Sequence, residues 1–202
     1  MIKYVVFDFD GTLADTFDEM KKIAREEFSL SGNDFGQIRK DGLREMIKTS
    51  GLSIKNFYTV AFNIKSKLNN ISNIKFFPNI IEILKELKSD YKLGIVSSNS
   101  EENIKKTLSR YGLEEVFDFI HSDSSFFGKH KVLTRVCKRL NVKPQEIIYI
   151  GDEDRDIKAA KKKKIKNIAV SWGFNSTDRL KEVEPDFLAH EPREITEYVG
   201  LL

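Results

Sequence analysis

Residues 2–12 read Ile-Lys-Tyr-Val-Val-Phe-Asp-Phe-Asp-Gly-Thr, and this stretch decides the fold class. Its first part is a short apolar run of β-branched and aromatic residues, which is typical of a buried strand. The run ends at Asp8, Asp10 and Gly11, and the glycine permits a sharp turn directly after the strand. We therefore expect a buried strand whose carboxyl end presents two acidic side chains.

Beyond Pro78, helix and strand patterns alternate along the chain. The proline lies near the first turn of a predicted helix with apolar residues at 80, 81, 83, 84 and 87. Strands separated by helices imply βαβ units and a parallel sheet, so the fold class is α/β with a Rossmann-like core. Strands are predicted at 91–96, 116–121, 146–150 and 167–172, and helices at 101–111, 131–140, 154–163 and, after a short helix and strand, 194–199.

The segment between the first strand and Pro78 has a different character. Helices are predicted at 16–28, 38–48 and 54–68, with no strong strand signal among them. We expect a core domain formed by residues 1–14 and 79–202 and a helical cap domain formed by residues 15–78.

Composition excludes several classes of protein. With 34 basic and 31 acidic residues, the net charge of +3 gives no reason to expect nucleic-acid binding. The single cysteine, Cys137, excludes an internal disulfide and a cysteine-based zinc site, and its apolar neighbours predict a core position. No apolar run approaches the roughly 18 residues of a membrane helix. We expect a cytoplasmic protein, and we expect the run Lys161–Lys164 to form a solvated helix end.

Polar residues follow several predicted strands. In open α/β sheets ligands bind at the carboxyl ends of the strands, so these residues should share one rim. Crowded carboxylates repel one another, and a hard divalent cation such as magnesium relieves that repulsion. An aspartate can attack phosphorus, a second can act as acid and base, and a lysine can hold phosphate oxygens. The rim residues are Asp8, Asp10, Gly11, Thr12, Ser97, Ser98, Asn99, Lys129, Asp152, Glu153, Asp154, Arg155 and Asp156.

These residues carry a resemblance to the haloacid dehalogenase superfamily. Residues 8–13 (DFDGTL) resemble its first motif, Ser97 its second, Lys129 its third, and residues 151–156 (GDEDRD) its fourth. The order of the motifs is the same, the likeness covers essentially the whole chain, and the helical insert resembles the C1 cap of the family. The layout is most similar to phosphoglycolate-phosphatase-like enzymes.

The resemblance implies a magnesium-dependent phosphatase that acts on small phosphomonoesters. Asp8 would be the nucleophile, and Asp10 would protonate the leaving alcohol and later activate water. Asp8, the Asp10 carbonyl and Asp152 would bind the metal, with Asp156 in support. Phosphate would be bound by Gly11, Ser97, Ser98 and Lys129, and Lys129 would also pair with Asp8. A monomer or homodimer acting on a small phosphorylated metabolite, without nucleic acid or membrane, is expected.

Some alternatives stay open at this point. The family often has Lys-Pro in its third motif, whereas this chain has Lys129 and Lys131 on either side of His130, and we favour Lys129. The same core motifs fit a phosphomutase of the β-phosphoglucomutase type, a phosphonate hydrolase that uses a cap lysine, or a non-catalytic phosphate-binding regulator. Basic residues of the cap, among them Arg39 and Arg44, suit either an anionic leaving group or solvent.

Overall fold

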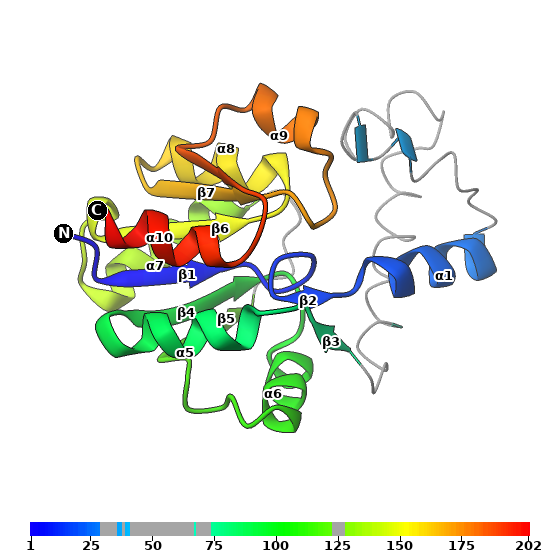
Figure 1. The fold of residues 1–202 in the computed structure, drawn as a ribbon, viewed down its shortest axis with the longest axis horizontal. Coiled ribbons are helices and arrows are strands. Elements are labelled where there is room, and N and C mark those ends of the chain that lie inside the picture. The colour runs from blue at the N-terminus through cyan, green and yellow to red at the C-terminus, as the bar shows by residue number, and fades with distance from the viewer. Residues whose placement is uncertain (29–35, 38, 41–66, 68–73, 123–127) are drawn as a thin grey trace.

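The computed structural model describes residues 1–28, 36–37, 39–40, 67, 74–122 and 128–202. Its centre is a six-stranded sheet, ordered β5-β4-β1-β6-β7-β8, in which every neighbouring pair is parallel. Figure 1 shows this sheet with helices on both of its faces. The strands are β1 (Tyr4–Phe7), β4 (Lys92–Ser97), β5 (Phe119–Ser122), β6 (Ile147–Gly151), β7 (Lys166–Val170) and β8 (Phe187–Ala189).

Alternating side chains of the strands enter two separate cores. On one face Val5, Phe7 and Ile95 pack with helices α5 (Ile80–Asp90) and α10 (Arg193–Gly200). On the other face Val6 and Tyr149 pack with α7 (Lys129–Leu140) and α8 (Asp154–Lys162). All four residues of β1 are buried because helices cover the sheet on both sides, which is why this strand is apolar throughout. Cys137 lies in the second core, as predicted.

The remaining elements of the core lie at the rim or edge of the sheet. Helix α6 (Glu101–Arg110) begins at Ser100, whose hydroxyl accepts a hydrogen bond from the Asn103 amide. Helix α9 (Thr177–Glu182) begins in the same way at Ser176. A 3₁₀ turn, η1 (Pro144–Glu146), precedes β6. The predicted α/β fold with a parallel sheet is thus confirmed, with element ends within a few residues of those expected.

The two connections to the insert pair with each other. The short strands β2 (Ala14–Asp15) and β3 (Lys75–Phe76) are antiparallel and form a second sheet. The sequence shows no strong strand signal in this segment, and the expectation of helices alone is wrong at its two ends. Two residues are too few to show periodicity, and this pairing is set by tertiary structure. Helix α1 (Phe17–Phe28) follows β2 and lies on the side of the carboxyl ends of the strands (Figure 1).

Most of the predicted insert lies outside the described residues. Of the helices predicted at 38–48 and 54–68, only positions 39, 40 and 67 are described, and all three are helical. Their arrangement as a cap domain therefore stays a prediction. In the ranges given above, no helix has the length and apolar character needed to cross a membrane.

Candidate active site

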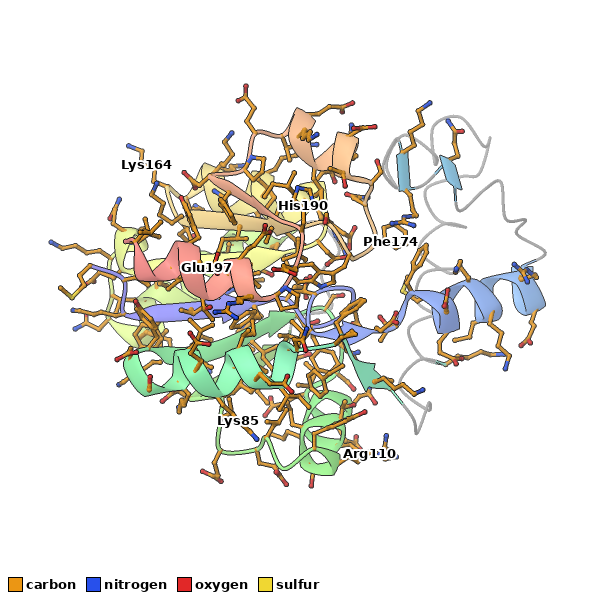
Figure 2. The ribbon with its side chains drawn as sticks, in the orientation of Figure 1. Lys85, Arg110, Lys164, Phe174, His190 and Glu197 are labelled. Carbon is orange, nitrogen blue, oxygen red and sulfur yellow. The ribbon has the colours of Figure 1, made fainter. Side chains whose placement is uncertain are left out.

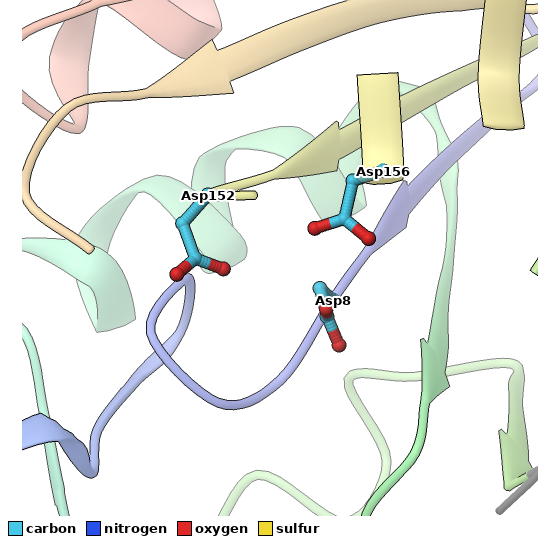
Figure 3. A group of neighbouring side chains, drawn as sticks. All are labelled: Asp8, Asp152 and Asp156. Carbon is cyan, nitrogen blue, oxygen red and sulfur yellow. The ribbon is translucent and has the colours of Figure 1, made fainter. Parts of the chain in front are cut away.

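Three buried carboxyl groups meet at the carboxyl ends of β1 and β6. Asp8 follows β1 directly, Asp152 follows β6, and Asp156 lies in the first turn of α8. Oxygen atoms of the three side chains lie within 4.8 Å of one another. Figure 3 shows the carboxyl groups gathered at this edge of the sheet. The register explains the meeting: Phe7 pairs with Ile150, so both chains leave the sheet at the same level.

Lys129 supplies positive charge to this group. Its ammonium lies 2.5 Å from Asp8 Oδ2, also pairs with Asp156, and is 5.4 Å from the centre of the Tyr149 ring. Its side chain is only 14% exposed, whereas Lys131 is exposed. Lys129 is the first residue of α7, so the helix predicted at 131–140 begins two residues earlier than expected. Lys129, and not the exposed Lys131, is therefore the lysine that contacts the carboxyl groups.

The shared burial of these charges shifts their protonation. Burial alone disfavours the ammonium, but the carboxylates of Asp156 and Asp8 outweigh it and raise the pKa of Lys129 well above its ordinary value. Burial raises the pKa of Asp156 to about 7 although Lys129 opposes this shift. Burial and neighbouring carboxylates also raise the pKa of Asp152 well above the ordinary range. With all three carboxyl groups ionised, the cluster would carry more negative charge than Lys129 balances, which is one reason why these pKa values rise.

Asp152 is held by groups from two loops. The Thr12 hydroxyl donates to its Oδ1 at 2.9 Å, and the Phe174 amide donates to its Oδ2 at 2.7 Å. Gly11 has φ +76°, and a Cβ atom there would lie 2.2 Å from Asp152 Oδ2, so only glycine fits this turn. Gly11 therefore serves the packing of the site as well as the turn that the sequence predicts.

Asp10 lies two residues beyond Asp8 and is less buried than it. The Asn99 side-chain amide donates to both of its carboxyl oxygens, at 3.1 and 3.0 Å. Asn99 is held in turn, because its Oδ1 accepts from the Ser100 amide at 2.8 Å and from Asn103 Nδ2 at 3.1 Å. The carboxyl group of Asp10 is thus fixed by a buried amide network at the end of β4.

The predicted phosphate-binding serines lie on the strand next to β1. Ser97 is the last residue of β4 and is buried, and its hydroxyl accepts from the Asn99 amide at 3.1 Å. Ser98 is half-buried in the turn that follows. Ser97 therefore does not cap α6, because Ser100 does. Both serines lie at the same edge of the sheet as Asp8, since β4 and β1 are paired in parallel.

Other charged residues of the fourth motif form ion pairs with partners outside the three carboxyl groups. Asp154 pairs with Lys158 and with Arg179, both at 2.6 Å, and Arg155 pairs with Glu153. Asp156 also accepts a hydrogen bond from the Glu153 amide at 3.2 Å, so it caps the helix as well as pairing with Lys129.

Three contributors to the site carry no role in the sequence-based prediction. Asn99 and Thr12 each stand inside or next to a predicted motif, so their place in the sequence could have signalled them. Phe174 contributes its backbone amide, and no side-chain pattern reveals such a contact.

Comparison with known proteins shows the family of the chain. Residues 5–170 match the haloacid dehalogenase-like hydrolase family. A phosphoglycolate phosphatase of Synechococcus elongatus is 31% identical, over 98% of this chain and 97% of that protein. A putative pyrophosphatase of Clostridium perfringens is 30% identical, over 100% of this chain and 99% of that protein.

Solved structures show the likeness of the fold. A haloacid dehalogenase-like hydrolase from Streptococcus pneumoniae has a TM-score of 0.80 and 27% identity, covering 98% of each chain. The predicted resemblance and the predicted enzyme class, a phosphatase of this type, are confirmed by these likenesses. The chain belongs to the haloacid dehalogenase-like hydrolase family.

Proposed function

We propose that this protein is a magnesium-dependent phosphatase of small phosphomonoesters that works through an aspartyl-phosphate on Asp8. The observation that carries the proposal is the different placement of two aspartates on one turn. Asp8 is 4% exposed and held by Lys129, whereas Asp10 is more open and held by an amide. Such a pair suits a fixed nucleophile beside an acid that exchanges protons with substrate and water.

The carboxyl cluster fits a hard divalent cation. Three carboxyl groups within 4.8 Å share one ammonium, and burial together with neighbouring carboxylates raises the pKa of Asp152, so a bound cation would stabilise its ionised form. Asp8 and Asp152, with the Asp10 carbonyl, would hold magnesium, and Asp156 would support the site by fixing Lys129. Bound magnesium would neutralise charge on the phosphoryl oxygens.

The side chains then divide the reaction between them. An Asp8 oxygen forms a bond to phosphorus while the bond from phosphorus to the ester oxygen breaks, and Asp10 gives its proton to that oxygen. In the second half Asp10 takes a proton from water, whose oxygen attacks phosphorus, and the Asp8 carboxylate leaves. Lys129, Gly11, Ser97 and Ser98 would hold the phosphate oxygens throughout.

The proposed substrate class rests on the relatives. The relatives named above are a phosphoglycolate phosphatase and a putative pyrophosphatase, so small anionic phosphate compounds are the proposed substrates. The protein would consist of a core domain of residues 1–14 and 79–202 and a cap domain of residues 15–78. The cytoplasmic location and the monomeric or homodimeric state stay predictions from the sequence.

The test is phosphate release from a panel that contains phosphoglycolate, pyrophosphate, sugar phosphates, nucleotides and p-nitrophenyl phosphate, with magnesium and with EDTA. Wild type is compared with Asp8→Asn and with Asp18→Asn, whose carboxylate is 81% exposed on α1. We expect magnesium-dependent release that Asp8→Asn abolishes and Asp18→Asn retains. A folded wild type that releases no phosphate overturns the proposal, and an isomeric sugar phosphate as product would show a phosphomutase instead.

A further inference from the structure

The loop formed by residues 172–176 follows β7 and encloses Asp152. Its Phe174 amide donates to the Asp152 carboxylate, and its Asn175 amide donates to the Asp152 carbonyl at 3.3 Å. Gly173 lies so close that a Cβ atom there would be 2.2 Å from Asp152 Cβ. The conformation of this loop therefore determines how the Asp152 side chain is presented to the site.

Arg39, from the segment between β2 and β3, binds carbonyl groups of this loop, whereas Asp152 accepts from one of its amides. Its Nε donates to the Phe174 carbonyl at 3.0 Å, and its Nη2 donates to the Gly173 carbonyl at 3.3 Å. In return the Ser176 amide donates to the Arg39 carbonyl at 3.0 Å. The guanidinium is thus engaged with two neighbouring carbonyl groups of the core.

Aromatic rings complete the contact. The Arg39 guanidinium lies 5.1 Å from the centre of the Phe17 ring, at the start of α1. The Phe17 ring meets the ring of Phe174 edge-on, with 5.3 Å between their centres. Figure 2 labels Phe174 on the side of the core that faces α1. Arg39 therefore contacts both α1 and the loop, which restricts the rotation of its side chain.

One peptide unit joins Arg39 to Asp152. The Gly173 carbonyl and the Phe174 amide belong to the same planar trans peptide, so they point in opposite directions. The carbonyl accepts from Arg39 and the amide donates to Asp152. A charged donor on the carbonyl fixes the plane of this peptide and strengthens its N–H as a donor. Two adjacent carbonyls also need the planar fork of arginine, which lysine lacks.

We propose that Arg39 is a positioning residue that orients Asp152 through the Gly173–Phe174 peptide. The inference deepens the proposed function, because it takes Asp152 as a ligand of the metal. It makes the metal affinity of the core depend on a residue of the segment between β2 and β3. Arg39 would then have a role different from the two considered for it in the sequence, which are recognition of an anionic leaving group and exposure to solvent.

The test begins with metal-free protein, so that it does not depend on catalysis. Amide hydrogen exchange at Phe174 and the emission of Trp172, the only tryptophan of the chain, report on the loop. Wild type is compared with Arg39→Met, with Arg39→Lys and with the control Arg25→Lys, an exposed arginine of α1. We expect exchange of the Phe174 amide to rise by about 10-fold in Arg39→Met, to rise less in Arg39→Lys, and to stay unchanged in the control.

Magnesium binding is then measured by calorimetry on the same proteins. We expect the dissociation constant for Mg²⁺ to rise by about 10-fold in Arg39→Met, as is usual when a group that orients a metal ligand is lost. At subsaturating magnesium, kcat of Arg39→Met should fall relative to wild type. The factor should be the same for phosphoglycolate and for p-nitrophenyl phosphate, whose leaving groups differ in charge.

Two results would overturn the positioning role. One is Phe174 exchange and Mg²⁺ affinity in Arg39→Met equal to those of wild type. The other is a rate loss confined to the KM of substrates with a carboxylate, which would make Arg39 a substrate-binding residue. If Phe174 exchange and Mg²⁺ binding change as expected while wild type hydrolyses no ester, the positioning role stands and only the proposed function fails.

Discussion

The two edges of the central sheet use acidic side chains in different ways. At the amino ends of the strands, three acids each pair with a lysine: Glu146 with Lys3, Asp118 with Lys88, and Asp186 with Lys166. At the carboxyl ends, Asp8, Asp152 and Asp156 lie within 4.8 Å of one another, and Lys129 contacts two of them. At the amino edge each of these acids has a lysine of its own, whereas at the carboxyl edge three carboxyl groups share one lysine.

The pKa values differ in direction between the edges. At the amino edge, hydrogen bonds and charge from Lys88 and the Leu93 amide overcome partial burial and lower the pKa of Asp118. At the carboxyl edge, burial raises the pKa of Asp152 and Asp156. Acids with a lowered pKa stabilise the fold at neutral pH, whereas acids with a raised pKa reduce its stability. The acids of the carboxyl edge therefore cost stability, which fits their proposed role in binding a cation.

Replacement of the two lysines should show the largest difference. Lys129→Met leaves the buried carboxylates without their cation, so we expect phosphatase activity to fall by about 100- to 1,000-fold and the free energy of unfolding to fall by about 3–5 kcal/mol. Lys88→Met removes a partly exposed pair and should cost about 0–1 kcal/mol with no loss of activity. Urea unfolding in EDTA and initial rates in magnesium measure both. Equal losses of stability in the two variants would contradict the comparison.

Removal of one carboxylate from each edge tests the metal. Wild type should gain about 1.4 kcal/mol of unfolding free energy when free Mg²⁺ is tenfold above its dissociation constant. Asp152→Asn should lose this gain and, in EDTA, should be at least as stable as wild type, because one repelling charge is gone. Asp118→Asn should keep the full gain from Mg²⁺. Thermal unfolding with and without Mg²⁺ measures the three proteins, and a full gain in Asp152→Asn would exclude Asp152 as a ligand.

Two buried asparagines make a further matched pair. Asn99 donates to Asp10 at the carboxyl edge, and Asn167 donates to Asp186 at 2.6 Å at the amino edge. Asn99→Ala should lower kcat by about 10- to 100-fold, because the proposed acid loses its orientation. Asn167→Ala should lower the stability by about 1–3 kcal/mol with kcat unchanged. Steady-state kinetics at a temperature where both variants are folded measures the two kcat values. An unchanged kcat in Asn99→Ala would show that Asn99 does not orient Asp10 for catalysis.

The carboxyl edge could be predicted from the sequence because its chemistry is carried by side chains at strand ends. The buried run before Asp8 and the position of Asp152 after another apolar run place both acids on one rim, whichever helices lie between them. Lys129 could be chosen over Lys131 because it stands next to Gly128, which precedes the helix.

Other features of the site have no such signal. The Phe174 amide acts through the backbone, and any residue except proline would present the same donor. The two-residue strands β2 and β3 exist because their chains pass side by side, and no periodicity marks them. Arg39 is one basic residue among 34, and only its contacts with two carbonyl groups distinguish it.

The smallest expected effect is the pH dependence of the amino edge. Asp118 Oδ2 accepts from the Leu93 amide and from Lys88 Nζ, each at 2.8 Å, and its pKa is lowered in the folded protein. Its contribution is therefore complete above the unfolded pKa of about 3.9 and is lost as the pH falls through the lower folded pKa. We expect Asp118→Asn to be less stable than wild type by about 1 kcal/mol from neutral pH down to about pH 5, with the difference shrinking below about pH 4. Urea unfolding of both proteins across this range isolates Asp118, because all other acids titrate in both. A difference that grows as the pH falls would mean that Asp118 is not held as its carboxylate, and the amino edge would lose its clearest paired acid.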